Sequence, residues 1–506
     1  MGKRRGEAAT RVPTGCPPFG GRASEPLGRG RPGGGHPGVP SGRGQLPVTD
    51  AANVDLTWVD EFVRQVRPYL SVRQADELLI LLPNQAYKLN STGLELLGRM
   101  LKGESLLAVL GAHAHDPAKR ADVHHFFCDL RALLVGCLGE GQERRAVETV
   151  PFHRPYNLLP VLSEVAVTYR CNLACLFCYA SCSCHQAAGS EELRTPQLER
   201  ILDVIRRDAQ VPSTSFTGGE PMLRPDIIDL VAYAKSIGLR VNLITNGTLV
   251  DADAACALRD AGLDSAQVSL EGVTPGTHDS LTQVEGSFQA TLAGVGHLRD
   301  VGLAVHTNTT LNRRNLAEAS QIPRLVQQLG LKRFSMNLVI PCGSAGPAAP
   351  GQGAEQPRES LRVRYSEVGD IVREVRKAAR RCEVQFLWYS PTPCCILNPV
   401  AEGLGHKGCA ACDGLLSVAP NGDVLPCSSL AEPVGNLLRE PFADIWRSDR
   451  ARYYQERGYA HQVCRECALF ELCDGACPIY WRSMGYAELS EVNAPPRQGC
   501  GGQGTW

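Results

Sequence analysis

The sequence has no long hydrophobic run and almost no net charge. None of its apolar segments approaches the ~20 residues that a membrane-spanning helix needs, and its first residues contain no apolar signal core. The formal net charge is -1 over 506 residues, so no general excess of basic residues points to nucleic acid or to an acidic membrane surface. We therefore expect a cytoplasmic protein that contacts neither nucleic acid nor membrane.

Cysteine, in contrast, is abundant, with 21 residues. In the reducing cytosol this number favours metal clusters over disulfides. The cysteines are also unevenly distributed, with five between residues 171 and 184 and ten between 394 and 500. We therefore predict two separate metal-binding regions. A chain of this length exceeds a single hydrophobic core, and about three folded domains are expected.

The first 56 residues are rich in Gly, Pro and Arg. Such a composition cannot bury enough apolar surface to form a core, so we predict a disordered basic tail. A nucleic-acid-binding arm and a misassigned translation start are the alternatives.

Residues 57–140 are predicted to form a small α+β domain. The run 77–82 (ELLILL) is a strand, and the alternating stretch 85–89 is its partner across a Pro-Asn turn. Asn90 and Ser91 then begin the first of three helices. This order, opening on LPNQAYKLNSTGLELL, resembles the PqqD-like peptide-recognition domain, a winged-helix unit. The resemblance implies that the domain binds the leader of a precursor peptide as an added strand. The alternative is an accessory domain that only covers its neighbour.

From residue 158 to residue 345, predicted strands and helices alternate, which is typical of a parallel α/β sheet. Five helices joining six strands predict a partial TIM-type (β/α)6 barrel, in which the chemistry lies at the carboxyl ends of the strands. The strands are expected at 162–168, 213–216, 240–245, 264–270, 304–310 and 334–340, and the helices at 196–208, 226–237, 251–261, 287–300 and 315–329.

Three cysteines follow the first of these strands at the spacing C-x3-C-x2-C: Cys171, Cys175 and Cys178. An iron–sulfur cube takes four ligands, so three thiolates leave one iron open for chemistry. A zinc knuckle is the alternative, but such sites pair C-x2-C with a second C-x2-C or H-x3-H, and no such partner lies nearby. The spacing, with Phe177 just before the third cysteine, resembles the radical S-adenosylmethionine (SAM) superfamily. The resemblance implies a [4Fe–4S] cluster whose open iron binds SAM.

The turn after the second strand carries Gly218, Gly219 and Glu220. Glycines allow the backbone to approach a ligand closely, and a carboxylate can bind an ammonium group. The three residues resemble the GGE motif of the superfamily, which implies that Glu220 binds the amino group of SAM.

Two later strand ends carry further polar residues. Ser269 and Glu271 end the fourth strand and resemble the ribose-contacting strand of the superfamily, although many relatives carry Asp at the second position. On the fifth strand, two roles for Asn308 are left open with equal weight: a contact to the SAM carboxylate, or an ordinary polar residue at a strand end.

Residues 346–393 are expected to be a linker and one helix. Residues 394–506 combine little regular structure with many cysteines, so metal must replace a large core there. Their pattern C-x9-G-x4-C, C-x2-C-x5-C-x3-C and a final C resembles the SPASM extension of radical SAM enzymes, which implies two auxiliary [4Fe–4S] clusters. By position, the first cluster takes Cys412, Cys427 and Cys477, and the second takes Cys464, Cys467, Cys473 and Cys500.

The fourth ligand of the first auxiliary cluster is left open. Cys409 is the nearest candidate, with Cys394 and Cys395 as alternatives, and an open iron that binds substrate is a further possibility. Structural zinc ribbons would explain the C-x2-C pairs but not the rest of the array. Cys182 and Cys184 are extra to the pattern and are expected to be bystanders.

The resemblance implies that the reduced cluster splits SAM into a 5′-deoxyadenosyl radical, which abstracts a substrate hydrogen. A flavodoxin- or ferredoxin-type donor would supply the electron, and the auxiliary clusters would accept the electron of the substrate radical or ligate the substrate. With the PqqD-like domain, this predicts a maturase that crosslinks or oxidises a ribosomally made precursor peptide.

Three alternatives remain. One is radical modification of a cofactor or tetrapyrrole side chain, as in the haem pathway. Another is an anaerobic sulfatase maturase, but those enzymes carry an Asp where this chain has Ser428 and lack a PqqD-like domain. The third is a non-catalytic leader-binding or electron-transfer scaffold, which the intact cysteine and GGE motifs disfavour.

Overall fold

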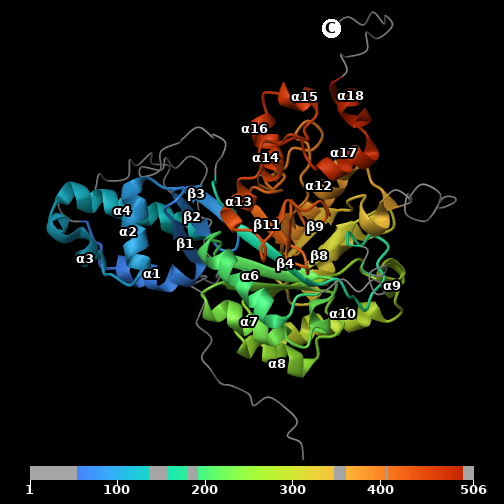
Figure 1. The fold of residues 1–506 in the computed structure, drawn as a ribbon, viewed down its shortest axis with the longest axis horizontal. Helices are drawn as coiled ribbons and strands as arrows, with labels where there is room; N and C mark the ends of the chain where they lie inside the picture. The colour runs from blue at the N-terminus through green and yellow to red at the C-terminus, as the bar shows by residue number, and fades with distance from the viewer. Residues whose placement is uncertain are drawn as a thin grey trace, which may run out of the picture.

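The computed structural model describes residues 54–135, 157–180, 182, 192–346, 361–405 and 407–493. Most of the expected tail, Cys184 and Cys500 lie outside the described residues. Figure 1 shows the N-terminal domain on one side of a central sheet and the C-terminal helices on another. No helix in the described part of the chain is long and apolar enough to cross a membrane.

The N-terminal domain has a three-stranded antiparallel sheet in the order β1-β2-β3. The two predicted strands and three predicted helices are present, whereas α1 and β1 were not predicted. Asn90 caps α2 as expected, because its side chain accepts a hydrogen bond of 2.7 Å from the backbone of Gly93. The elements are α1 (Val59–Val66), β1 (Leu70–Arg73), β2 (Leu78–Leu81), β3 (Gln85–Lys88), α2 (Ser91–Leu101), α3 (Leu106–Leu110) and α4 (Pro117–Val135).

A buried ion pair attaches this domain to the barrel. Arg73 and Asp76 lie 2.8 Å apart and are almost completely buried. Arg73 also donates to the carbonyl of Pro160 at 2.6 Å, and Asp76 accepts from the backbone of Leu158 at 3.0 Å. Because the pair is desolvated, removal of one partner would leave an uncompensated buried charge.

The barrel strands are parallel and adjacent in chain order, as predicted. Residues such as Val165 and Phe216 face the helices and are fully buried, while the intervening residues face the lumen. The strands are β4 (Leu162–Thr168), β5 (Ser213–Gly218), β6 (Arg240–Thr245), β7 (Ser265–Ser269), β8 (Ala304–Leu311) and β9 (Arg333–Leu338).

The barrel helices also lie close to their predicted positions, with two differences. Helix α9 was not predicted, and the expected helix 315–329 is a 3-10 turn (Leu316–Gln321) followed by α11. The helices are α6 (Thr195–Arg207), α7 (Ile227–Ser236), α8 (Ala252–Asp260), α9 (Pro275–Thr282), α10 (Ser287–Asp300) and α11 (Ile322–Gln328).

The expected linker region contributes instead to the barrel. Helix α12 (Tyr365–Arg381) leads into β10 (Gln385–Trp388), which pairs in parallel with β9. At the other end of the sheet, β11 (Leu415–Val418) pairs in parallel with β4. The six predicted strands are therefore flanked on both sides by strands from later in the chain.

The remaining C-terminal elements are short, as expected of a domain with little regular structure. They are β12 (Asp423–Leu425), β13 (Gly435–Asn436), α13 (Phe442–Trp446), α14 (Asp449–Gln455), α15 (Gln462–Arg465), α16 (Phe470–Cys473), α17 (Pro478–Met484) and α18 (Ala487–Asn493).

Candidate active site

The C-x3-C-x2-C loop follows the carboxyl end of β4, as the barrel rule requires. Its backbone is held by the end of α9. Ala174 donates to the carbonyl of Thr282 at 3.0 Å, and Leu176 donates to that of Leu281 at 3.0 Å. The unpredicted helix α9 therefore supports the cysteine loop.

The three cysteines are half-buried and lie close enough for their thiols to influence one another. Burial, together with the nearby Glu220 and Cys178, raises the pKa of Cys171 to about 11. Burial also raises the pKa of Cys175 well above its ordinary value, with added effects of Glu271 and the other two thiols. Such thiols become thiolates when a metal binds them. Three convergent cysteine sulfurs are the donor set that an iron–sulfur cluster uses, so these residues fit that group.

A zinc knuckle and an iron–sulfur cluster need different spacings between their cysteine sulfurs. In the residues that the structure describes, no three His, Cys, Asp or Glu side chains are arranged to hold a single metal ion. A zinc ion needs each thiolate within about 2.3 Å. In a [4Fe–4S] cluster, each thiolate binds a different iron, so the sulfur atoms stand further apart.

The glycines of the GGE motif pack against the cysteine loop. A Cβ atom at Gly218 would lie 2.1 Å from the carbonyl oxygen of Thr168, and one at Gly219 would lie 2.1 Å from that of Arg170. The backbone of Glu220 also donates to Arg170 at 2.8 Å. The need for glycine therefore arises here from the close approach of two loops, rather than from a ligand alone.

The Glu220 carboxylate is fully buried at the centre of this junction. It accepts hydrogen bonds from the Thr245 hydroxyl at 2.7 Å, from the Asn246 backbone at 2.7 Å and from the Met222 backbone at 3.0 Å. Burial raises its pKa, and these bonds oppose the rise. A carboxylate has about four acceptor positions. One position is therefore left for a further donor, such as an ammonium group.

Sequence analysis assigned no role to residues 245–247, but this turn after β6 is part of the site. The Asn246 amide donates to the side chain of Asn172 at 2.8 Å and lies 4.0 Å from the sulfur of Cys171. Tyr179 was also missed, and its hydroxyl donates to the carbonyl of Gly218 at 3.3 Å. Two features of the sequence could have indicated these residues: Tyr179 directly follows a cysteine of the motif, and Asn246 directly follows a predicted strand.

The other predicted SAM contacts differ in their burial and in the hydrogen bonds that they make within the protein. Glu271 is buried and accepts from the Thr310 backbone at 2.9 Å, and burial raises its pKa to about 8. The Asn308 amide donates to Asn337 at 2.8 Å and accepts from a neighbouring serine, which favours a role as a polar strand residue. Ser269 and Phe177 are half-buried, and their roles remain predictions.

Cys182 lies closer to the cluster loop than a bystander would. Its side chain is buried and hydrogen-bonded to that of Cys178, and its backbone lies 3.5 Å from the same sulfur. This contact raises the pKa of the Cys182 thiol.

The C-terminal cysteines gather in two groups. In one, the pKa of Cys427 is raised by burial and by the nearby thiols of Cys409 and Cys477. In the other, burial and the nearby thiols of Cys473, Cys395 and Cys467 raise the pKa of Cys464 to about 11.

Cys394 and Cys395 lie with the second group. The Cys394 backbone donates to the sulfur of Cys473 at 3.2 Å, and the thiols of Cys473 and Cys467 raise the pKa of Cys395. Neither is therefore placed to complete the first auxiliary cluster, contrary to the alternatives considered from sequence.

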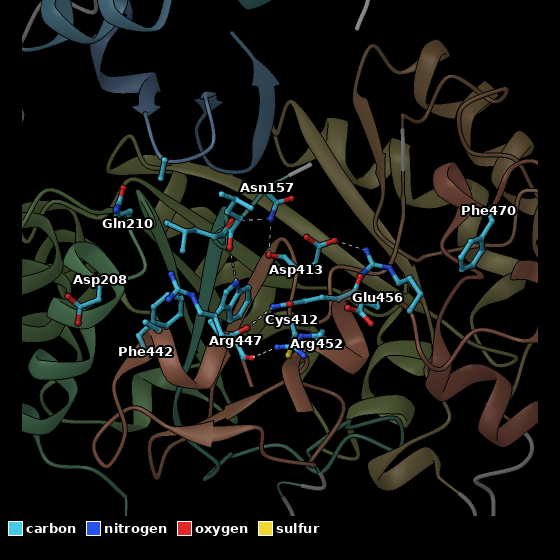
Figure 2. Close-up of a pocket in the computed structure, with 17 residues that line it drawn as sticks. Asn157, Asp208, Gln210, Cys412, Asp413, Phe442, Arg447, Arg452, Glu456 and Phe470 are labelled. Carbon is cyan, nitrogen blue, oxygen red and sulfur yellow. Dashed lines mark hydrogen bonds and ion pairs between the residues drawn. The ribbon is translucent and has the colours of Figure 1, made fainter. Parts of the chain in front are cut away.

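One well-defined cavity lies away from this chemistry. It has a volume of about 770 Å³ and is lined by residues of the N-terminal domain, the segment before β4 and the C-terminal domain. In Figure 2, Asn157 and Asp413 lie across it, joined by a hydrogen bond of 3.1 Å. Because residues 157–159 precede β4, the cavity lies at the opposite end of that strand from the cysteine loop.

Comparison with known proteins agrees with this geometry. Residues 165–322 match the radical SAM superfamily, and residues 409–468 match the SPASM iron–sulfur cluster-binding domain. The PqqA peptide cyclase of Xanthomonas axonopodis pv. citri is 30% identical over 329 residues, which cover 82% of that protein and 63% of this chain. The chain belongs to the radical SAM superfamily. It therefore uses SAM and [4Fe–4S] clusters.

Two further similar proteins differ from the cyclase, one in its named activity and the other in the share of this chain that it matches. The AdoMet-dependent heme synthase of Nitratidesulfovibrio vulgaris is 29% identical over 323 residues, covering 85% of that protein and 61% of this radical SAM enzyme. The crystal structure of Streptococcus suis SuiB bound to its precursor peptide SuiA matches with a TM-score of 0.57 and 16% identity. That match covers 94% of SuiB and 81% of this chain.

Proposed function

We propose that this radical SAM enzyme crosslinks or oxidises a ribosomally made precursor peptide. The observation that carries the proposal is a separately folded N-terminal domain, attached by the buried pair Arg73–Asp76 to the segment that leads into β4. An enzyme that acts on a small molecule has no need of such a domain. The domain suits a maturase of precursor peptides, because it would hold the leader while the core reaches the barrel.

The extent of the matches supports this choice. The haem synthases and peptide cyclases match 61–66% of the chain, so the shared part does not separate the two activities. The match to SuiB, a protein crystallised with a precursor peptide, covers 81% of the chain, more than residues 157–506 alone can supply. It therefore reaches into the N-terminal domain.

The chain's own residues would bind and orient the reactants. We propose that Cys171, Cys175 and Cys178 hold the cluster that cleaves SAM, and that the remaining acceptor position of Glu220 binds the SAM ammonium. The cluster held by these residues would supply the electron for the reductive cleavage of SAM, and a flavodoxin or ferredoxin is the proposed donor to it.

The test is to co-express the chain with the short reading frames that flank its gene and to measure peptide masses. We expect one peptide to lose two hydrogen atoms, and to remain unchanged with the Cys171→Ala, Cys175→Ala, Cys178→Ala triple variant. The purified triple variant should also form no 5′-deoxyadenosine. A wild-type enzyme that cleaves SAM while every such peptide stays unmodified would contradict the peptide proposal.

Tetrapyrrole modification is the second candidate, because haem synthases are among the relatives. It predicts that the N-terminal domain binds no peptide and that a porphyrin side chain is oxidised instead. Incubation of the reduced enzyme with SAM and a tetrapyrrole, followed by mass spectrometry, separates the two candidates.

A further inference from the structure

One cysteine outside both predicted arrays lies between the SAM-binding loop and the C-terminal domain. Cys342 is in the turn after β9, at the carboxyl end of the barrel. The next residue, Gly343, approaches the cysteine loop so closely that a Cβ atom there would lie 2.2 Å from the carbonyl oxygen of Cys178. Ser344 donates to the same oxygen at 2.8 Å. The turn is thus fixed against the first cluster loop.

The other side of this turn contacts the C-terminal domain. The hydroxyl of Ser483 in α17 donates to the carbonyl of Pro341 at 2.9 Å. Cys477 is the N-cap residue of the same helix. The thiol of Cys342 is also hydrogen-bonded to the side chain of Ser429, two residues after Cys427. Cys342 is therefore held beside two cysteines of the first auxiliary array.

The thiols of this region influence one another. Apart from burial, the pKa of Cys427 is raised by Cys409, Cys477 and Cys342, and the pKa of Cys477 by Cys409 and Cys342. We call Cys342, Cys409, Cys427 and Cys477 the four-thiol group. Three elements supply them: the turn after β9, the stretch before β11 and the C-terminal loops.

Cys412, which position in the sequence assigns to the first cluster, has other neighbours. The residue is completely buried and borders the 770 Å³ cavity shown in Figure 2, together with Asp413 and Arg457. The charged and thiol groups that affect its pKa are Cys409, Asp413 and Arg457. The SPASM match also begins at Cys409, so that residue can serve as the first cysteine of the array.

We propose that Cys342 is the fourth ligand of the first auxiliary [4Fe–4S] cluster, with Cys409, Cys427 and Cys477, and that Cys412 is not a ligand. The inference does not depend on which substrate the enzyme takes. It has two consequences. The cluster has four protein ligands and no iron left open for substrate, and one of its ligands comes from the barrel beside Cys178.

The test compares Cys342→Ser with the matched control Cys412→Ser, each in the full-length protein reconstituted with iron and sulfide under anaerobic conditions. Saturating SAM occupies the open iron of the cluster at Cys171, Cys175 and Cys178, so any remaining open iron belongs to an auxiliary cluster. In Cys342→Ser we expect an altered electron paramagnetic resonance signal that shifts further on addition of imidazole. Cys412→Ser should keep the wild-type iron content and signal.

A wild-type signal in Cys342→Ser, or the loss of about one cluster's iron in Cys412→Ser, would overturn the proposal. If Cys342→Ser does not fold, the wild-type protein supplies the second measurement. Iodoacetamide should label Cys342 after a chelator has removed the iron, but not in the loaded protein. Equal labelling in both states would also overturn it.

Discussion

Substitution of Gly219 by alanine tests whether the contact between the GGE turn and the cysteine loop sets SAM binding. The new Cβ atom would lie 2.1 Å from the Arg170 carbonyl oxygen and 2.7 Å from its carbon, so one of the two loops must move by about 1 Å. Overpacking of this kind costs about 1–3 kcal/mol. Because Arg170 directly precedes Cys171, the displacement acts on the cluster loop rather than on the distant helices.

If the whole cost falls on the SAM complex, Gly219→Ala weakens SAM binding by about 5- to 150-fold, since about 1.4 kcal/mol corresponds to a factor of ten. The assay is a SAM titration of the reduced protein with the cluster signal as readout, alongside iron content and thermal unfolding. Gly296→Ala is the matched control, because a Cβ atom there meets nothing within 4 Å. In the interior of α10 it should stabilise the protein by about 0.5–1 kcal/mol. Equal SAM affinity in both variants would refute the reasoning.

Three further predictions concern other parts of the molecule. Arg73→Ala should destabilise the docked N-terminal domain by about 3–5 kcal/mol, because it leaves Asp76 buried without its partner. Limited proteolysis of the chain before residue 157 measures this, and a variant as resistant to the protease as the wild type would contradict it. Glu220→Gln should weaken SAM binding and lower the melting temperature, because an amide cannot accept from all three donors that contact the carboxylate; unchanged SAM affinity would exclude a role for the charge. Burial and two arginines lower the pKa of His306 to about 3, so the folded state binds fewer protons than the unfolded state between about pH 3 and pH 6.5, and stability falls as pH drops through that window. Between about pH 7 and pH 5, the free energy of unfolding of the wild type should fall by about 2 kcal/mol relative to that of His306→Gln, as measured in denaturant titrations. If the free energies of unfolding of the two proteins change with pH in parallel, the ring is not buried in its neutral form.

The sequence was sufficient for the barrel because the signals there are local. Each strand from β4 to β9 is a short apolar or alternating run, and a capping residue such as Asp251 marks a helix start. Hydrophobic periodicity and caps depend on neighbours within a few residues, so they can be read without knowing the tertiary structure. The cysteine and GGE motifs are local as well, and they lie at adjacent strand ends as expected.

The remaining features depend on contacts between distant residues, which periodicity does not reveal. Strand β10 has only four residues and is defined by its pairing with β9, so it was assigned to a linker. Cys394 and Cys395 were considered for the first auxiliary cluster by distance along the chain, but the fold places them beside Cys473. Cys342 had no motif at all, and only its turn against Cys178 reveals it.

The pairing of β4 with β11 also bears on how the protein is made. Strand β4 carries the cysteine loop, yet one of its two neighbours, β11, is synthesised roughly 250 residues later, which takes about 12–50 s on a ribosome. During that interval the edge of β4 is available to other chains, and an exposed apolar edge favours aggregation. The first cluster must therefore be loaded either before the sheet is complete or through a finished and closed protein. Slower translation between these two strands should change the yield of loaded enzyme.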